Sequence, residues 1–226
     1  MIRSSPTWLL PAAALSAALT IAADWAGIGA LHFVLKPLTT LLIITWAWSR
    51  GGDAPARQRW VRIGLVWSLV GDVALLWPQQ GFLPGLVSFL LAHLAYIVAF
   101  TRGLRFAARP LPFVAYALVA GAILSVLWPG VPPALRGPVL AYVAALACMA
   151  AQAGAWWLAA RGGPDEPWAR RAALGGVLFM ASDATLAVNR FLSPVPASGL
   201  WILATYWAAQ AAITGSLRSG TNSLKE

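Results

Sequence analysis

Charged side chains are scarce in this sequence of 226 residues. Asp, Glu, Lys and Arg together make up 10% of the chain, whereas 60% of it is hydrophobic. Because soluble domains average roughly 25% charged residues, most of the chain cannot face water. The sequence also has no long polar stretch that could form a second domain. The composition therefore predicts one membrane-embedded domain over residues 1–226, and it excludes a coiled coil and a disordered chain.

Cysteine and histidine are almost absent as well. Cys148 is the single cysteine and the histidines are His32 and His93, so a disulfide framework is excluded. Metal-dependent lipid hydrolysis usually requires three histidines or an equivalent cluster, and we therefore expect no metal and no other cofactor. Phosphate-binding loops, dinucleotide fingerprints and the G-x-S-x-G motif of serine hydrolases are missing. The net charge of +9 comes without a Lys/Arg-rich helix, which argues against nucleic acid as a partner.

Long apolar runs are what the sequence does contain. A helix needs about 20 residues to cross roughly 30 Å of hydrocarbon, and segments of this kind are separated by short breaks rich in Pro, Gly and Arg. The runs are continuous and do not alternate with period two, which favours helices over a membrane β-barrel. We therefore predict an all-α fold with eight transmembrane helices at about 7–23, 31–48, 60–77, 82–100, 111–128, 137–159, 169–188 and 199–217.

The arginines fall on alternate loops. The breaks around 50–62, 102–109 and 161–171 are basic, as are both ends of the chain, whereas the intervening breaks hold only Arg136 and Arg190. Because cytoplasmic loops of membrane proteins carry the excess of Lys and Arg, both termini are predicted to be cytoplasmic. The abundance of Ala, Arg and Trp indicates a bacterial source, and hence the bacterial cytoplasmic membrane.

Two aspartates lie inside predicted spans. Asp72 follows Gly71 in the span 60–77, and Asp183 follows Ser182 in the span 169–188, both about three-quarters of the way along. A carboxylate at membrane depth costs about 3 kcal/mol on insertion scales, so its presence requires an explanation. Each aspartate alone could be a structural hydrogen-bond partner for neighbouring helices. Two at matched depth, each behind a small residue, favour a shared polar chamber.

Further polar residues lie within or at the ends of the spans. His93 and Tyr96 share one helical face, and Lys36 precedes a proline near the start of the span 31–48, where proline suits the first turn of a helix. For His93, orienting a catalytic carboxyl and filling a core hydrogen bond are equal alternatives. Tyr206 and Gln210 belong to a stripe at four-residue spacing, which is more typical of hydrogen bonding between helices than of substrate contact.

An ordered set of residues extends across the second, third, fourth, seventh and eighth spans: Lys36-Pro37, Gly71-Asp72, Phe82, Gly85, Phe89, His93, Tyr96, Gly176, Phe179, Ser182-Asp183, Arg190-Phe191, Tyr206 and Gln210. Their order and spacing resemble those of the YhhN-type lysoplasmalogenases. The first, fifth and sixth spans match that family only in hydropathy and length. Trp207 departs from the pattern, because a second tyrosine or a similar residue is expected there.

The resemblance implies an integral membrane enzyme that needs no metal. Its substrate would be a lysoplasmalogen, a lysophospholipid with one alkenyl chain, and the reaction would hydrolyse the vinyl ether bond at the first glycerol carbon. The products would be a fatty aldehyde and glycerophosphoethanolamine or glycerophosphocholine. Headgroup preference, chain-length preference, the access route of the substrate and the oligomeric state are not fixed by the sequence.

The chemistry of a vinyl ether explains why acidic residues are needed. Protonation of its β-carbon gives an oxocarbenium ion that water captures, and the resulting hemiacetal collapses to aldehyde and alcohol. The enzyme must supply a neutral acid and an anion beside the developing cation, as glycosidases do. We hypothesise that Asp72 and Asp183 form this pair, since desolvation and mutual repulsion keep one carboxyl neutral while its partner stays ionised. Which residue is the acid stays open.

The remaining candidates take supporting roles. Lys36, with Arg190 as the weaker candidate, would bind the substrate phosphate near the interface, although Arg190 near a span end also fits an interfacial anchor. The residues expected to orient a carboxyl, the water or the substrate are His93, Tyr96, Ser182, Tyr206 and Gln210.

Two functions from other classes compete with hydrolysis. A proton-coupled small-solute transporter could use Asp72 and Asp183 as titrating sites, and a structural membrane protein or lipid scramblase would need no covalent chemistry. Transporters often contain inverted repeats and broken helices. The sequence has no convincing internal duplication, and its Gly and Pro residues interrupt the chain between spans more than within them.

Overall fold

The computed structural model describes residues 6–50 and 54–218. Within these residues the chain forms eight α-helices, two short 3-10 turns and no strand, so the predicted all-α class is confirmed. The helices are α1 (Leu9–Trp25), α2 (Gly29–Ser49), α3 (Pro55–Ala74), α4 (Phe82–Thr101), α5 (Pro110–Leu127), α6 (Arg136–Ala160), α7 (Glu166–Phe191) and α8 (Ser198–Gly215). The 3-10 turns, Trp128–Gly130 and Pro133–Leu135, join α5 to α6.

Most helix bounds agree with the predicted spans to within a few residues, but α3 is shifted. It was predicted at 60–77 and instead begins at Pro55 and ends at Ala74. Proline suits the first turn of a helix, which explains the early start. At the other end, Pro78 lies just beyond the helix, and the residues before it form turns.

Five helices are long and apolar enough to cross a membrane on these two criteria alone: α2, α4, α7, and α5 and α6 when each is extended by its adjoining 3-10 turn. The helix α1 is apolar but shorter. Although α3 and α8 do not meet the criteria, α3 packs between α2 and α4, and α8 contacts both α2 and α7. Eight membrane crossings therefore stay a prediction.

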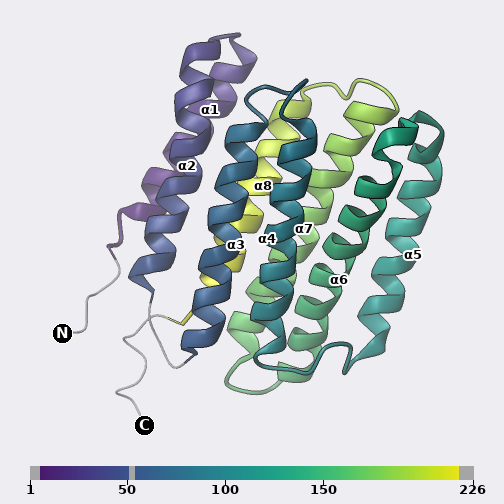
Figure 1. The fold of residues 1–226 in the computed structure, drawn as a ribbon. Helices are drawn as coiled ribbons and strands as arrows, with labels where there is room; N and C mark the ends of the chain where they lie inside the picture. Colours follow the sequence, from purple (N-terminus) through teal and green to yellow (C-terminus); the bar gives the residue numbers. More distant parts are fainter. Residues whose placement is uncertain (1–5, 51–53, 219–226) are drawn as a thin grey trace.

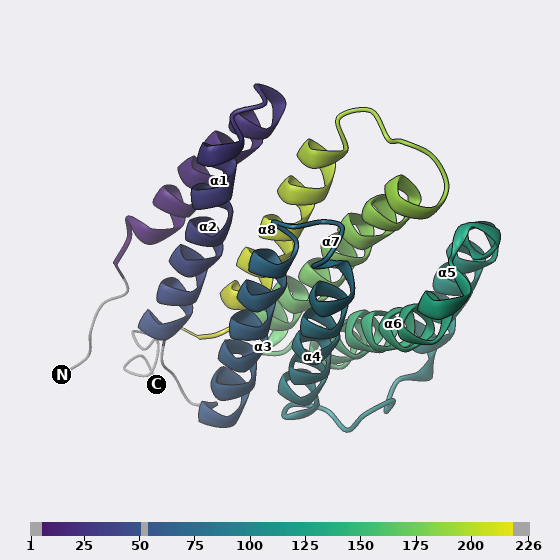
Figure 2. The ribbon, with the colours of Figure 1, turned by 45° about the horizontal axis from the view of Figure 1, so that its top comes forward.

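The helices form one bundle in which successive helices run in opposite directions (Figure 1). The connections α1–α2, α3–α4, α5–α6 and α7–α8 all lie at the top of Figure 1, which we call the upper end, and the other connections lie at the lower end. The α1–α2 pair flanks the bundle on one side and α5 on the other, as Figure 2 also shows. The basic breaks therefore share the lower end, whereas Arg136 and Arg190 belong to the upper end. Arg3 and Lys225 lie outside the described residues.

Arginines at the lower end complete the hydrogen bonding of helix ends. Arg62 donates to three backbone carbonyls at the end of α2. Arg50 donates to the carbonyl of Leu217, and Arg171 donates to that of Gly215, both at the end of α8. The last carbonyls of a helix have no partner inside it, and cations are favourable near its C-terminus. These side chains therefore stabilise the ends of α2 and α8.

Glycines let the central helices approach closely. A Cβ atom added to Gly64 on α3 would lie 2.3 Å from the Tyr96 ring on α4, and one added to Gly71 would lie 2.5 Å from the Phe89 ring. On α7, Gly176 lies against the backbone of Ala150 on α6. Small residues at such positions allow tight packing of helices in membranes, and here they bring large aromatic side chains of α4 against α3.

We expect Gly64→Ala to lower the melting temperature of the purified protein, because the added methyl group displaces Tyr96 from its site. Overpacking of this kind costs about 1–3 kcal/mol. The matched control is Gly121→Ala on α5, where an added Cβ meets nothing within 4 Å and where alanine favours the helix by about 1 kcal/mol. Thermal unfolding followed by tryptophan fluorescence compares the two. Equal melting temperatures would contradict the close packing at Gly64.

Candidate active site

Asp72 lies in the last turn of α3 and is 1% exposed. Its Oδ2 atom accepts hydrogen bonds from Thr40 Oγ1 at 2.5 Å and from the Tyr206 hydroxyl at 2.8 Å. Trp207 Nε1 in turn donates to Thr40 Oγ1 at 3.1 Å. Side chains from α2 and α8 thus converge on one carboxyl of α3. Trp207, the departure from the family pattern, supplies an indole donor to this network.

Lys36 approaches the same carboxyl from the upper end. It lies one helical turn before Thr40 on α2, is 7% exposed, and interacts electrostatically with Asp72 and with Asp24 of α1. Its ammonium group forms no hydrogen bond or close ion pair with any residue that the structure describes. Because α2 begins at Gly29, Pro37 lies inside the helix and not in its first turn. The missing N–H of Pro37 frees a backbone carbonyl one turn earlier.

A second polar cluster joins α4 to α8. The Tyr96 hydroxyl donates to Gln210 Oε1 at 2.7 Å and lies 3.5 Å from Ser68 Oγ on α3. Tyr206, Gln210 and Thr214 are all buried, so the polar stripe of α8 faces the interior of the bundle. These contacts fit the interpretation of the stripe as hydrogen bonding between helices.

His93 is fully buried and has aromatic neighbours. Its ring centroid lies 5.2 Å from that of Tyr142 and 4.7 Å from that of Phe179, in edge-to-face arrangements. Neither ring nitrogen has a hydrogen-bond partner among the described residues. Since buried polar groups are nearly always paired, this histidine has unused donor and acceptor capacity. Its proposed role in orienting a carboxyl stays a prediction.

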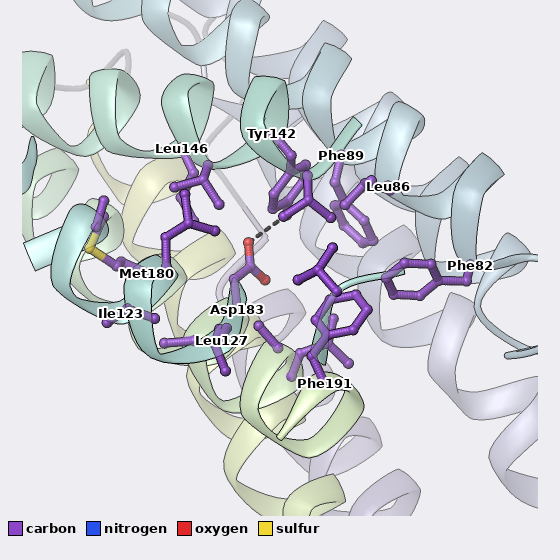
Figure 3. A pocket seen from close by; sticks show the side chains of 18 of the residues that line it. Phe82, Leu86, Phe89, Ile123, Leu127, Tyr142, Leu146, Met180, Asp183 and Phe191 are labelled. Atoms are coloured by element: carbon purple, nitrogen blue, oxygen red, sulfur yellow. Dashed lines mark hydrogen bonds between the residues drawn. The ribbon is translucent and has the colours of Figure 1, made fainter. Parts of the chain in front are cut away.

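Asp183 lies in a pocket between α4, α5, α6 and α7. Its Oδ2 atom accepts a hydrogen bond from the Tyr142 hydroxyl at 2.5 Å, the interaction drawn as a dashed line in Figure 3. Apart from these two residues, the lining consists of apolar side chains: Leu75, Phe82, Leu86, Phe89, Ala120, Ile123, Leu124, Leu127, Val131, Val139, Val143, Leu146, Met180, Ala184, Leu186, Ala187 and Phe191. The space between them is about 860 Å³, counting the part open to the surroundings.

A cation lies beside the pocket, toward its upper end. The Arg190 guanidinium is 4.9 Å from the ring centroid of Phe82, and Phe82 in turn packs edge-to-face against Phe191. Both phenylalanines line the pocket. Lys36 has different surroundings, near Asp72 and Asp24. The structure therefore does not bring the two predicted phosphate ligands together by any contact.

The two aspartates occupy separate surroundings. Asp72 does not line the pocket that holds Asp183, and no hydrogen bond or ion pair joins the two carboxyls in the described chain. Phe89 and Phe179 pack edge-to-face against Tyr206, at 5.7 and 5.6 Å, and so form an aromatic layer next to the pocket. Chemical cooperation between Asp72 and Asp183 stays a prediction.

Ser182 has a structural contact. Its hydroxyl donates to the backbone carbonyl of Ile202 on α8 at 3.0 Å and does not line the pocket. Sequence reasoning missed Thr40 and Tyr142, which donate directly to the aspartates. The four-residue spacing from Lys36 places Thr40 on the same face of α2. Tyr142 carries an isolated side-chain hydroxyl in an Ala-rich span. A hydroxyl at that depth in the membrane was the signal that could have identified it as a site residue.

No group of three or more His, Cys, Asp or Glu side chains that could hold a metal ion occurs in residues 6–50 and 54–218. The donors to Asp72 and Asp183 are hydroxyl groups, and the Trp207 indole donates to one of these hydroxyls.

We expect Thr40→Val to destabilise the protein, because it removes a donor to Asp72 and leaves the Trp207 indole without an acceptor. A buried polar group left unpaired costs about 1–3 kcal/mol. Thr45→Val is the matched control, since Thr45 is exposed on the same helix and bonds only to a carbonyl of that helix. Urea or thermal unfolding in one detergent checks the difference. If both variants unfold together with the wild type, the Thr40 contact contributes nothing.

Comparison with known proteins gives consistent matches. The sequence matches the YhhN family over residues 31–217. It is 39% identical to "Lysoplasmalogenase TMEM86A" of Homo sapiens over 153 residues, which are 66% of this chain and 60% of that protein. It is 38% identical to "Lysoplasmalogenase TMEM86B" of Sus scrofa over 194 residues, 84% of this chain and 75% of that protein.

A bacterial relative matches over a longer stretch. The "Uncharacterized membrane protein YhhN" of Escherichia coli O157:H7 is 31% identical over 215 residues, 93% of this chain and 98% of that protein. The chain thus spans about three-fifths of the length of the human TMEM86A protein and nearly all of the bacterial one. No solved structure matches the chain. The apolar helices and these relatives identify an integral membrane protein.

Proposed function

The chain belongs to the YhhN family, and from this premise we propose that it is an alkenyl ether hydrolase acting on lysoplasmalogens. Its reaction would cleave the vinyl ether bond and release a fatty aldehyde and glycerophosphoethanolamine or glycerophosphocholine. The names of the mammalian relatives support this activity. The Asp183 carboxyl in the wall of an otherwise apolar pocket is the observation that supports it from the side of the structure.

The pocket suits a lipid with one chain. Its apolar side chains would surround the alkenyl chain, as is usual for sites that bind apolar ligands. The vinyl ether is the one reactive group at the junction of chain and glycerol. A pocket that holds the alkenyl chain therefore needs a single acid where that alkenyl chain meets the lipid headgroup. Asp183 is the acidic residue in the pocket lining.

We assign the proton donor to Asp183. Apolar surroundings disfavour a charged carboxylate, and the hydrogen bond from Tyr142 fixes the orientation of the group. The acid transfers its proton to the β-carbon, and water adds to the oxocarbenium carbon while its proton returns to the Asp183 carboxylate. The hemiacetal then collapses as its hydroxyl proton moves to the departing glycerol oxygen. The acid is regenerated and one water molecule is consumed in each cycle.

We assign the anion to Asp72. Two hydroxyl donors on one oxygen and the ammonium of Lys36 nearby favour its ionised form. Tyr206 links this carboxylate to the aromatic layer beside the pocket. In the water-poor interior, a fixed negative charge stabilises a developing cation more strongly than it would in water.

Arg190 is the better placed ligand for the substrate phosphate. It lies over Phe82 at the upper end of the pocket, whereas Lys36 lies near Asp72 and acts as its counter-ion. A guanidinium held against an aromatic face keeps its N–H donors available for phosphate.

The orientation in the membrane is also a proposal. The lower end carries the basic loops and would face the cytoplasm of a bacterial cell. The helix α1 begins and α8 ends at this lower end (Figure 1). The terminal residues 1–5 and 219–226, which were predicted to be cytoplasmic, lie outside the described residues.

We expect Asp183→Asn and Asp72→Asn each to reduce aldehyde release from a lysoplasmalogen by about 10² or more, since general acid-base catalysis contributes about 10² to 10⁴ in rate. The matched control is Asp165→Asn, a partly exposed aspartate at the lower end that pairs with Arg218. Detergent-purified variants are assayed for free aldehyde, and their melting temperatures show whether they remain folded. A saturated alkyl ether should stay intact, because it has no carbon that can be protonated.

Wild-type turnover in folded Asp183→Asn would contradict the assignment of the acid, and wild-type turnover in folded Asp72→Asn would contradict that of the anion. Failure of the wild-type protein itself to release aldehyde would instead support the transporter or the structural alternative.

We expect Arg190→Gln and Lys36→Gln to differ in the kinetic constant that they change. Loss of a phosphate ligand should raise KM about tenfold, which corresponds to about 1.4 kcal/mol of binding, with little change in kcat. Loss of the counter-ion of Asp72 should lower kcat instead. Steady-state aldehyde release against lysoplasmalogen concentration separates the two effects, and a KM increase confined to Lys36→Gln would reverse the two roles.

A further inference from the structure

A second groove lies between α5, α6 and α7 at the lower end of the bundle. Its lining includes Tyr116 of α5, Gly154 and Trp157 of α6, and Arg170 and Leu174 of α7. These positions fall near the beginning of α5, near the end of α6 and near the beginning of α7. Neither aspartate of the proposed reaction lines this groove.

Two guanidinium groups at the groove differ in what holds them. Arg171 donates to the carbonyl of Gly215 and is therefore occupied. Arg170 is exposed and has no hydrogen bond or ion pair with the rest of the described chain. Acidic groups adjacent in sequence are engaged elsewhere, because Asp165 pairs with Arg218 at 2.6 Å and Glu166 accepts a hydrogen bond from the backbone of Gly162 at 2.8 Å.

A third cation lies over the aromatic wall. The Arg161 guanidinium is 4.8 Å from the ring centroid of Trp157, which lines the groove. The rest of the lining is mainly apolar. It includes Leu174 and Val177, which are 52% and 51% exposed. The groove thus combines cations at the level of the helix ends with an apolar wall that extends toward the middle of the bundle.

This combination selects one kind of occupant. A phosphate group with acyl chains matches both parts, because membrane-surface cations attract anionic lipids by about 1 kcal/mol each and the chains cover the apolar wall. A second copy of this chain fits less well. A two-fold interface would place the same patch on both partners and would bring their Arg170 and Arg171 side chains together.

We propose that this groove is a binding site for an anionic phospholipid of the leaflet at the lower end, with the lipid phosphate on Arg170 and Arg161 and an acyl chain along Leu174 and Val177. The site is separate from the proposed hydrolysis. Its test is lipid binding and does not require aldehyde release.

The test is native mass spectrometry of the full chain in detergent, titrated with dioleoylphosphatidylglycerol or dioleoylphosphatidylcholine. We expect the wild type to retain the anionic lipid preferentially and Arg170→Gln to weaken its binding about tenfold, equal to about 1.4 kcal/mol. The matched control is Arg59→Gln, which removes the same charge from an exposed position on α3. Leu174→Trp fills the apolar part without changing charge and should weaken binding as well.

Three outcomes would overturn the proposal. Equal retention of both lipids would remove the anionic selectivity, and an equal loss in Arg59→Gln and Arg170→Gln would reduce the effect to overall charge. A dimer that Leu174→Trp dissociates would assign the groove to a second copy of the chain. Melting temperatures of the variants, measured in parallel, show that any loss of lipid occurs in folded protein.

Discussion

Two carboxyls inside the bundle, Asp72 fully buried and Asp183 partly buried, impose the constraint on which the rest of the structure depends. A carboxylate among apolar helices must receive its hydrogen bonds from the protein, because lipid offers none. Asp72 receives them from Thr40 and Tyr206, so α2 and α8 are held to one register against α3. Asp183 receives one from Tyr142, which fixes α6 against α7. A rotation of any of these helices would leave an acid unpaired, and packing and site geometry are therefore determined together.

The aromatic layer formed by Phe89, Phe179 and Tyr206 separates two environments. On one side the polar side chains of α2, α3 and α8 surround Asp72, and on the other the apolar walls of the pocket surround Asp183. Edge-to-face contacts at 5.7 and 5.6 Å set the relative orientation of these rings. Asp72 does not line the pocket. The proposed acid, Asp183, and the proposed anion, Asp72, are not joined by a hydrogen bond through which they could share a proton.

The sequence predicted the helices well because Pro or Gly lies within a few residues of the end of each apolar run. It predicted that Asp72, Tyr206 and Gln210 face inward because polar groups at membrane depth are unfavourable against lipid. The bounds of α3 were less accurate, since its first turn is polar and does not read as a span. The donors Thr40 and Tyr142 could not be assigned, because contacts between helices far apart in sequence depend on packing angles that periodicity does not encode. A shared chamber for both aspartates stays a prediction, since Asp183 lines the pocket described above and Asp72 does not.

Arginines at both ends of the bundle lie over aromatic rings, but their hydrogen-bond partners differ. At the lower end Arg50 and Arg62 donate to the last carbonyls of helices, so the basic loops stabilise the backbone as well as bias orientation. At the upper end Arg136 lies over Trp128 and Arg190 over Phe82, and neither has a carboxylate partner in the described chain. A guanidinium held on a ring keeps its donors free. In a lysoplasmalogen the phosphate, the vinyl ether and the alkenyl chain follow one another in this order. The free N–H donors, the acid and the apolar walls of the pocket match that order.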